Sequence, residues 1–250
     1  MLQGKNAVVT GARTGIGRAT VEKFAEFGAN IWACARQPDA AFESDMKNIS
    51  HRYGIWIETV FFDFADKSQI EAGAKEILSA KRPVDILVNN AAINQTELFM
   101  KASIDNIEHL FAVDFFGPLL FTQKLAKRMM RGKASSIVNI SSLRGLQPAP
   151  GRLAYSSAKS ALKTATETLA LELASSGVRV NAVAPGQIGS ERMMEELKER
   201  KTSINNALGR FGTSAEVAEV ILFLASDMSS YMTGETIPVT GGRGTDFTSS

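Results

Sequence analysis

The sequence predicts an α/β fold: a single Rossmann-type domain with a doubly wound, seven-stranded parallel sheet and helices on both faces. Short runs of β-branched and aromatic residues alternate with longer segments whose apolar residues recur at helical spacing. Strands that alternate with helices form parallel sheets, because a parallel neighbour needs a crossover connection. No Pro- or Ser-rich linker and no internal repeat interrupts the alternation, so we expect one domain over residues 1–250.

The composition is that of an ordinary globular protein, with 44% hydrophobic and 22% charged residues. The 28 basic and 26 acidic residues nearly balance, which gives no reason to expect nucleic acid or a membrane as a partner. The single cysteine, Cys34, excludes an internal disulfide and suits a reducing compartment. Apolar runs such as Val220–Ala225 are too short to cross a bilayer, and the N-terminal residues lack a signal-peptide pattern. We therefore expect a cytoplasmic protein.

The first elements read as strand, helix, strand and strand. Asn6–Thr10 is a short β-branched apolar run, and Gly15–Phe27 follows with apolar residues at helical spacing. Gly28 stands where a helix C-cap is expected. Asn30–Ala35 and Ile55–Phe62 are again apolar and β-branched or aromatic, which predicts two further strands.

The middle of the chain continues the pattern. Asp66 and Gln69 form a capping-box-like start of a helix that runs to residue 80. Asp85–Asn89 is a short apolar strand. Ser103–Arg131 is a long helical stretch, which we expect to be disturbed near Pro118 because proline cannot donate a backbone hydrogen bond.

The last elements complete seven strands. Ser136–Ile140 is predicted to be a strand, and Ala154–Ser175 is rich in Ala, Leu and Glu, which predicts a helix. Arg179–Ala184 is a strand ended by a proline, Ser214–Leu224 is a helix, and Glu235–Val239 is the last strand.

The segment 187–212 lies outside the alternation. It contains Glu191–Lys201, an amphipathic, charged helical stretch. A helix that lies on a membrane surface is the alternative, but acidic and basic residues are mixed here. We expect a lid over a pocket.

A glycine-rich loop lies between the first strand and the first helix, in Thr10-Gly11-Ala12-Arg13-Thr14-Gly15-Ile16-Gly17. Glycines at this junction allow a tight turn and let the backbone approach a pyrophosphate at the helix N-terminus. At the end of the second strand, dinucleotide-binding folds place an acid when they bind the ribose hydroxyls of NAD. Here Arg36 stands there, and a guanidinium can instead pair with the 2′-phosphate of NADP.

Tyr155 and Lys159 lie four residues apart on one face of a predicted helix, and Ser142 follows the strand before it. A phenol is a poor base at neutral pH, and a nearby ammonium favours its ionised form. A hydroxyl beside the phenol can hold a carbonyl oxygen. Neither of the other tyrosines, Tyr53 and Tyr231, has a lysine at the fourth position.

Together these motifs resemble the short-chain dehydrogenase/reductase family, and among its members bacterial 3-oxoacyl-acyl-carrier-protein reductases. The resemblance covers nearly the whole chain. In order, the motifs are Thr10–Gly17, Asn89-Asn90-Ala91-Ala92, Ser142, Tyr155 with Lys159, Pro185-Gly186, and Gly234 with Gly241-Gly242. Two positions depart from the family pattern. Ala92 stands where glycine is usual, and Asp114 stands where asparagine is common.

The resemblance implies a single dinucleotide-binding catalytic domain that transfers hydride between NADP(H) and a carbonyl carbon. Tyr155 would be the general acid, Ser142 would hold the carbonyl oxygen, and Lys159 would favour the phenolate and bind the nicotinamide ribose. In the family the backbone of the asparagine helps to hold a water in the proton relay to the lysine, which places Asp114 among the implied catalytic residues. Asp114 would keep that backbone role, alter the surroundings of Lys159, or be a solvated residue at the helix kink. The residues implied to bind the cofactor are Gly11, Arg13, Thr14, Gly15, Ile16, Gly17, Arg36, Asp63, Phe64, Asn90, Ala91, Ala92, Tyr155, Lys159, Pro185, Gly186, Ile188 and Ser190. No metal is implied, and His51 and His109 are isolated in the sequence.

The substrate is implied only as a small-molecule carbonyl or alcohol. Three hypotheses remain open: a reductase of a 3-oxoacyl thioester or similar ketone, a dehydrogenase of a sugar, polyol or nucleotide-sugar, and a non-catalytic dinucleotide-binding regulator. The expected pocket is mixed in character and consists of Ile93, Asn94, Leu143, Arg144, Gln147, Gln187, Met193 and Met194.

Two surface features bear on partners. Basic residues Lys127, Arg128, Arg131 and Lys133 end the long helix, either to dock an acyl carrier protein or because a helix C-terminus favours positive charge. The resemblance implies a homotetramer, and apolar residues on the two long helices exceed what one sheet face needs, which indicates an interface. They are Phe111, Phe115, Phe116, Leu119, Leu120, Leu169 and Leu173.

Overall fold

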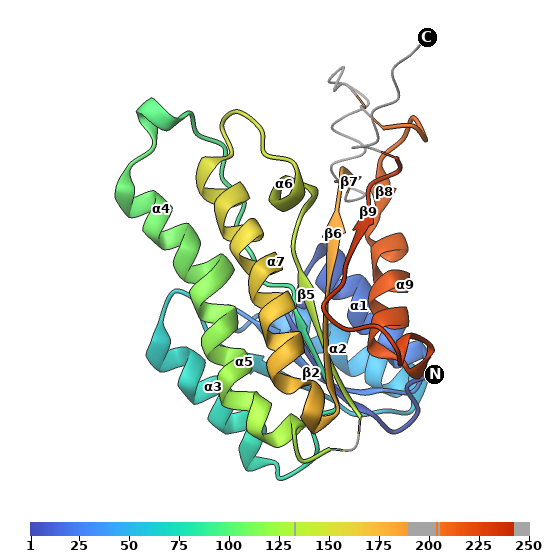
Figure 1. The fold of residues 1–250 in the computed structure, drawn as a ribbon. Helices are drawn as coiled ribbons and strands as arrows, with labels where there is room; N and C mark the ends of the chain where they lie inside the picture. Colours follow the sequence, from blue (N-terminus) through green and yellow to red (C-terminus); the bar gives the residue numbers. More distant parts are fainter. Residues whose placement is uncertain (133, 190–203, 205, 243–250) are drawn as a thin grey trace.

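A seven-stranded parallel sheet forms the centre of the computed structural model, which describes residues 1–132, 134–189, 204 and 206–242 (Figure 1). The strand order is β3-β2-β1-β4-β5-β6-β9, and every neighbouring pair is parallel. The predicted fold class is thereby confirmed. The strands are β1 (Asn6–Thr10), β2 (Asn30–Ala35), β3 (Ile57–Phe61), β4 (Ile86–Asn89), β5 (Ser135–Ile140), β6 (Val178–Pro185) and β9 (Thr236–Val239).

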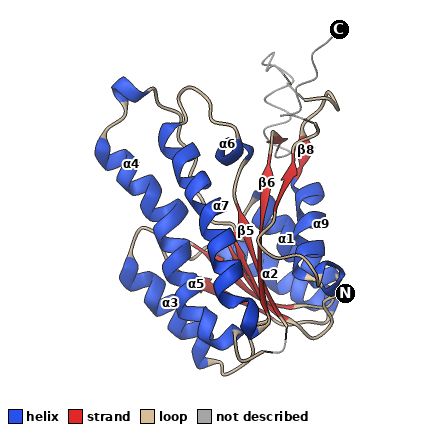
Figure 2. Ribbon diagram, viewed as in Figure 1, coloured by secondary structure: helices blue, strands red, loops and turns tan. Residues whose placement is uncertain are grey.

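Helices cover both faces of the sheet (Figure 2). One face carries α1 (Gly15–Glu26), α2 (Ala40–Tyr53) and α9 (Ser214–Ala225). The other carries α3 (Lys67–Ser79), α5 (Gly117–Met129) and α7 (Leu153–Leu173), with α4 (Ile104–Phe111) beside α7. The short elements are η1 (Phe99–Lys101), η2 (Ala112–Phe116), α6 (Leu143–Leu146), η3 (Ala174–Ser176), β7 (Ile188–Gly189), β8 (Gly212–Thr213) and η4 (Asp227–Ser229).

The central strands are buried on both faces, which explains why they read as apolar runs rather than as alternating patterns. In β1, Ala7 and Val9 pack into the core beneath α1 and α9, whereas Val8 packs into the core beneath α3 and α5. In β2, Ile31 packs into the core beneath α1 and α9, and Trp32 packs into the core beneath α3 and α5.

Helix α2 is the one long element within the described residues that the sequence analysis missed. The Asp39 carboxylate caps its N-terminus by accepting from the backbone N–H groups of Ala41 and Phe42, at 2.9 and 3.0 Å. Gly54 ends it in the left-handed conformation, with φ of 64°. Both ends therefore carried a residue that favours a helix boundary.

The predicted long helix is interrupted as expected, and the interruption is a π-helical turn. Between α4 and α5 the chain makes a π-helical turn, η2, immediately before Gly117 and Pro118. A side chain on Gly117 would lie 2.7 Å from the carbonyl oxygen of Phe64, so the helix backbone passes close to the end of β3. Such wide turns re-aim the side chains that they carry, and Asp114 in this one is fully buried.

The predicted lid lies mostly outside the described residues, so it stays a prediction, as does the single domain. The parts that are described meet: β7 pairs with β8, and the Gly212 N–H donates to the Gln187 carbonyl at 3.0 Å. Both ends of the 187–212 segment are thus held at the same place beside β6. None of the helices in the described part of the chain is long and apolar enough to span a membrane.

Candidate active site

The candidate site residues gather at one edge of the sheet, where the parallel strands end. The glycine loop follows β1, Arg36 follows β2, and Asn90 follows β4. β1 and β4 are neighbours, so the strand order reverses between them. At such a reversal the connections leave to opposite faces of the sheet and a crevice opens between them.

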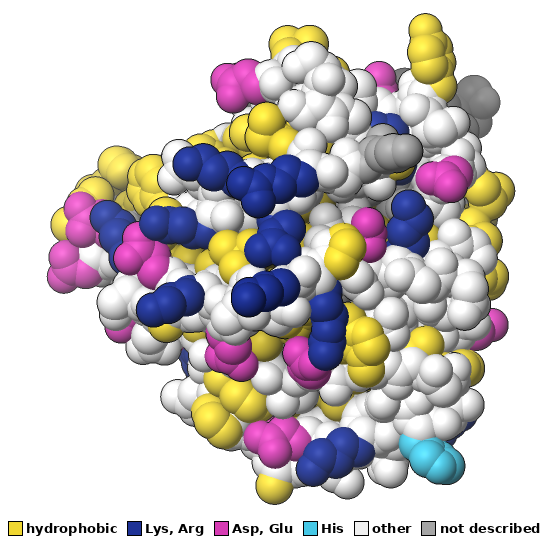
Figure 3. Space-filling view, turned by 90° about the horizontal axis from the view of Figure 1, so that it is seen from below, with side chains coloured by type: hydrophobic (Ala, Val, Ile, Leu, Met, Phe, Trp, Pro, Cys, Tyr) yellow, Lys and Arg dark blue, Asp and Glu magenta, His cyan; other side chains and the backbone are white. Residues whose placement is uncertain are grey.

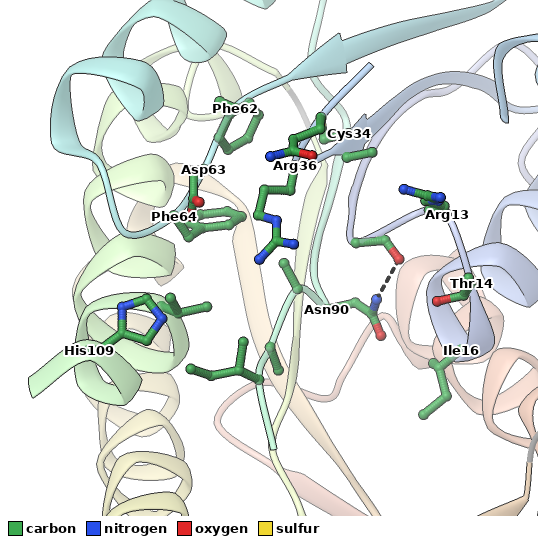
Figure 4. A pocket seen from close by; sticks show the side chains of 17 residues that line it. Arg13, Thr14, Ile16, Cys34, Arg36, Phe62, Asp63, Phe64, Asn90 and His109 are labelled. Atoms are coloured by element: carbon green, nitrogen blue, oxygen red, sulfur yellow. Dashed lines mark hydrogen bonds between the residues drawn. The ribbon is translucent and has the colours of Figure 1, made fainter. Parts of the chain in front are cut away.

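The crevice contains a cavity of about 410 Å³ (Figure 4). It lies between the glycine loop and the ends of β2, β3 and β4. The sequence-predicted residues that line it are Gly11, Arg13, Thr14, Ile16, Arg36, Asp63, Phe64, Asn90, Ala91 and Ala92. Further lining residues that the sequence did not single out for the cofactor are Cys34, Ala35, Gln37, Phe62, Ile93, His109 and Val113. His109, which is isolated in the sequence, is exposed on α4 and borders the cavity.

Hydrogen bonds from the Asn90 side chain hold the glycine loop in place. The Asn90 side-chain amide donates to the carbonyls of Thr10 and Gly11, at 2.9 and 3.2 Å. Gly11 has φ of 64°, and a side chain on Gly17 would lie 2.2 Å from the Gly11 carbonyl oxygen. The position of Gly11 therefore favours glycine for its backbone conformation, and that of Gly17 requires glycine for close packing.

The N-terminus of α1 faces this loop without an acidic residue in its first turn. Its N-cap residue, Thr14, makes no side-chain capping bond, so the first N–H groups of the helix have no side-chain acceptor from it. Unpaired N–H groups and the helix dipole both favour an anion at this end.

Two arginines, Arg13 and Arg36, line the cavity, and they differ in the contacts of their side chains. Figure 4 shows the Arg36 side chain reaching into the cavity between Phe64 and Asn90. Arg13 instead forms an ion pair with Asp39, with 2.5 Å between Nη2 and Oδ2. The Phe42 N–H bond and the Arg13 charge both hold the pKa of Asp39 below its usual value. Arg36 is thus directed into the cavity, whereas Arg13 forms an ion pair with Asp39, the residue that caps α2.

A second cavity, of about 300 Å³, adjoins the first, because residues 91–93 line one and Asn94 lines the other. Ser142 follows the end of β5 and is buried, and its hydroxyl oxygen accepts from the Arg144 N–H at 3.1 Å. Tyr155 lies in the first turn of α7. The lining residues are Asn94, Ser142, Leu143, Arg144, Arg152, Tyr155, Pro185, Gly186 and Gln187.

Lys159 lies one turn after Tyr155, behind the cavity. Only 2% of it is exposed. Its Nζ donates to the Ile140 carbonyl at 3.1 Å and lies 5.8 Å from the centre of the Tyr155 ring. The ammonium is therefore fixed beside the phenol by the end of β5.

Asp114 forms a buried ion pair with Lys159, with 3.1 Å between Oδ2 and Nζ. Its other oxygen accepts from the Ile93 N–H at 2.8 Å. Burial raises the pKa of Asp114, while the Lys159 charge and the Ile93 bond oppose that shift. Of the alternatives for Asp114, the solvated residue at a helix kink is wrong, because the π turn directs this carboxylate into the interior beside Lys159.

A buried network of amides and hydroxyls joins the elements beneath the site. The Asn89 amide donates to Thr122 Oγ1 at 2.9 Å and to Asn139 Oδ1 at 2.8 Å. The Asn139 amide in turn donates to Thr166 Oγ1 at 2.9 Å. This network connects β4, β5, α5 and α7, so it fixes the strand ends relative to the helix that carries Tyr155 and Lys159.

Several predicted residues lie elsewhere. Gly15 and Gly17 belong to the loop but do not line the cavity, and Lys159 is buried behind Tyr155. Ile188 lines a separate cavity of about 100 Å³, and Gln147 lines neither of the two cavities described above. Ser190, Met193 and Met194 lie outside the described residues. In the described ranges, no three His, Cys, Asp or Glu side chains come together as a metal site requires.

Lys127, Arg128 and Arg131, at the end of the long helix, lie at the opposite end of the sheet from this site. α5 ends just before β5 begins, whereas Ser142 follows the end of β5. Figure 3 views this lower end, where Lys and Arg side chains gather among acidic ones. Arg128 donates to the carbonyls of Leu78 and Arg82, both at 3.3 Å, so it caps the end of α3. Lys133 lies outside the described residues.

Comparisons with known proteins agree on one family. A family model described as enoyl-(acyl carrier protein) reductase matches residues 11–243. The 3-oxoacyl-[acyl-carrier-protein] reductase of Aquifex aeolicus is 39% identical over 96% of this chain and 98% of its own length. The corresponding reductase of Thermotoga maritima is 37% identical over 96% and 98%. L-Sorbose reductase from Gluconobacter frateurii, solved with NADPH and L-sorbose, superposes with a TM-score of 0.89 at 27% identity, covering 96% of this chain and 97% of that one.

Proposed function

The chain belongs to the short-chain dehydrogenase/reductase family of oxidoreductases, and we propose that it is an NADPH-dependent carbonyl reductase that uses Ser142, Tyr155 and Lys159. The observation that carries the proposal is the shared cavity. Ser142 and Tyr155 line it together, Lys159 is fixed one turn behind, and it adjoins the crevice beside the glycine loop.

The first cavity fits a dinucleotide phosphate. Its walls combine an uncapped helix N-terminus, a close-packed glycine loop and the Arg36 guanidinium. Phe64 offers an apolar surface for an adenine, and Arg36 would pair with the 2′-phosphate. NADPH bound there would supply the hydride.

The proposed roles of the protein groups follow from their contacts. The Ser142 oxygen already accepts from the Arg144 N–H, so its own hydrogen is left to donate to a substrate carbonyl oxygen. Tyr155 would give that oxygen its proton as general acid. The Lys159 ammonium, held by the Ile140 carbonyl, would stabilise the phenolate that remains. Asp114 offsets part of that positive charge.

The leading substrate is a ketone of the 3-oxoacyl type, because relatives at up to 39% identity over nearly the whole chain carry that name. A sugar or polyol is the second candidate, supported by the polar lining of the cavity and by the superposition with L-sorbose reductase. A non-catalytic regulator would have no need of this Ser-Tyr-Lys arrangement. NADPH consumption with acetoacetyl-CoA and with L-sorbose would separate these candidates, and no turnover of any ketone would contradict the proposal.

Cofactor choice is tested at Arg36. We expect NADP(H) to bind at least about tenfold tighter than NAD(H), because charge-assisted hydrogen bonds to the 2′-phosphate are worth at least that factor. Arg36→Asp should invert the preference. Arg13→Ala should cost less, because Arg13 is held by Asp39. Dissociation constants measured by fluorescence titration would be equal for the two cofactors if this assignment were wrong.

A further inference from the structure

The second cavity carries positive charge that the proposed reaction does not use. Of the nine described residues that line it, two are charged, and both are arginines, Arg144 and Arg152. None of the nine is a carboxylate. The remaining polar groups are amides and hydroxyls, which can donate hydrogen bonds to an anion as well as to a neutral ligand.

Arg152 is anchored close to the reacting group. It immediately precedes α7, and its Nη1 donates to the Gln95 carbonyl at 3.1 Å and to the Asn94 side-chain oxygen. Its guanidinium carbon lies 6.0 Å from the centre of the Tyr155 ring. The loop after β4 therefore holds one nitrogen of the guanidinium and thereby fixes the group beside the phenol.

The rest of that guanidinium is available to a ligand. Within the described residues, Nη2 and Nε of Arg152 have no hydrogen-bond or ion-pair partner. The side chain is partly buried, so its charge is screened less than a fully exposed one. A planar guanidinium with free N–H groups matches a carboxylate, which it can bind through two parallel hydrogen bonds.

We propose that the substrate is a short 3-oxo acid with a free carboxylate, which Arg152 binds while its ketone oxygen lies at Ser142 and Tyr155. This inference rests on the proposed function and narrows its substrate class. The guanidinium carbon lies 6.0 Å from the centre of the Tyr155 ring, which suits a short acid whose carboxylate and ketone are close together. A thioester of the same skeleton is neutral and would leave the Arg152 charge unpaired.

The first test compares three ketones that share one skeleton. NADPH consumption by the full chain is measured with acetoacetate, methyl acetoacetate and acetoacetyl-CoA. We expect kcat/KM for the acid to exceed that for its methyl ester by about 10- to 100-fold, the usual worth of hydrogen bonds to a charged group. Arg152→Gln should reduce that ratio by a similar factor, mainly through KM for the acid. Arg152→Lys should retain much of the ratio of acid to ester, because lysine keeps the positive charge. It should not retain all of the ratio, because lysine lacks the planar pair of donors.

Lys163→Gln is the matched control, since Lys163 lies on the same helix and pairs with Glu167 away from the cavity. It should leave the ratio of acid to ester unchanged. If the ester or the thioester is used as well as the acid, and Arg152→Gln does not change the ratio, Arg152 serves only to fasten the 94–95 loop and the proposal is overturned.

A binding measurement separates this proposal from the proposed function. Calorimetry on the NADP⁺-loaded protein with 3-hydroxybutyrate should show binding that is lost on methylation of the acid and weakened by Arg152→Gln. Such binding without turnover of any ketone would support the carboxylate site and contradict the reductase. Equal affinity for the acid and its ester would overturn the carboxylate site whatever the turnover.

Discussion

At the scale of single residues, the buried ion pair between Asp114 and Lys159 is the feature of this site that bears most directly on the proposed chemistry. A buried ion pair gains little net stability, because removing both charges from water costs about as much as their attraction returns. We therefore expect the ion pair to affect the ionisation of Tyr155 rather than the stability of the fold. The carboxylate lies 3.1 Å from the ammonium that would favour the Tyr155 phenolate, so it weakens that influence.

Replacing Asp114 by Asn should reveal this charge balance. The amide can still accept from the Ile93 N–H, but it leaves the Lys159 charge uncompensated and the phenolate easier to form. We expect the pH–rate profile for alcohol oxidation to move toward lower pH, with higher turnover at neutral pH. Initial rates across a pH series would check this. An unchanged profile would mean that the Asp114 charge does not reach the reacting group.

Some site residues could be predicted from the sequence and others could not. Ser142, Tyr155 and Lys159 were found because their spacing places them around one strand end and one helix face. The Asp114–Lys159 contact depends on the π turn, and no residue pattern specifies such a turn in advance. Arg152 was missed although it stands three residues before Tyr155, because only the loop after β4 directs it into the cavity.

At the scale of elements, strands were predicted better than helix α2. The predicted bounds of β1 and β2 match the structure, because a short continuous apolar run is typical of a parallel strand that is buried on both faces. In α2, only Phe42, Met46 and Ile49 are buried, so its apolar face is narrow and its sequence resembles a polar loop.

The N-terminus of α9 provides a test of an element's stability. The Glu216 carboxylate accepts from Arg210, from the Thr213 N–H and from the Thr213 hydroxyl. The Arg210 bond is the largest cause that lowers the pKa of Glu216 from 4.5 to about 2. A lowered acid pKa contributes stability above the unfolded value, and that stability is lost as the pH falls from about 4.5 to about 2.

Glu216→Gln should therefore lower the thermal unfolding midpoint at pH 7, with the difference from the unaltered protein closing as the pH approaches 2. Arg210→Gln should reproduce the pattern, and the double variant should lose little more than either single one. Calorimetric scans at several pH values would check this. A difference between the proteins that is the same at all pH values would show that the charge of Glu216 does not matter.

At the scale of the whole molecule, α5 and α7 leave an apolar groove of about 800 Å³ on the outer face. Phe116, Leu120 and Leu169 line it, and Phe116 is 56% exposed. Exposed apolar surface of this kind marks association, and a second copy of the same helix pair would cover it by a twofold contact.

We expect light scattering to report the homotetramer that the family resemblance implies, in which this twofold contact is one of two kinds of interface, at micromolar concentration. Leu120→Glu should shift the protein to a smaller species, because it places an unpaired charge in the groove, whereas Leu120→Met keeps the surface apolar and should not. A monomer for the unaltered protein would contradict the predicted assembly.

Turnover of the Tyr155→Phe variant tests the central claim most directly. The substitution removes the transferable proton and keeps the ring, so NADPH affinity should persist while kcat falls by about 10²- to 10⁴-fold, the usual contribution of one positioned acid. Tyr231→Phe is the control, since Tyr231 is fully exposed on the surface. A Tyr155→Phe protein that reduces its ketone at close to the original rate would contradict the assignment of the site.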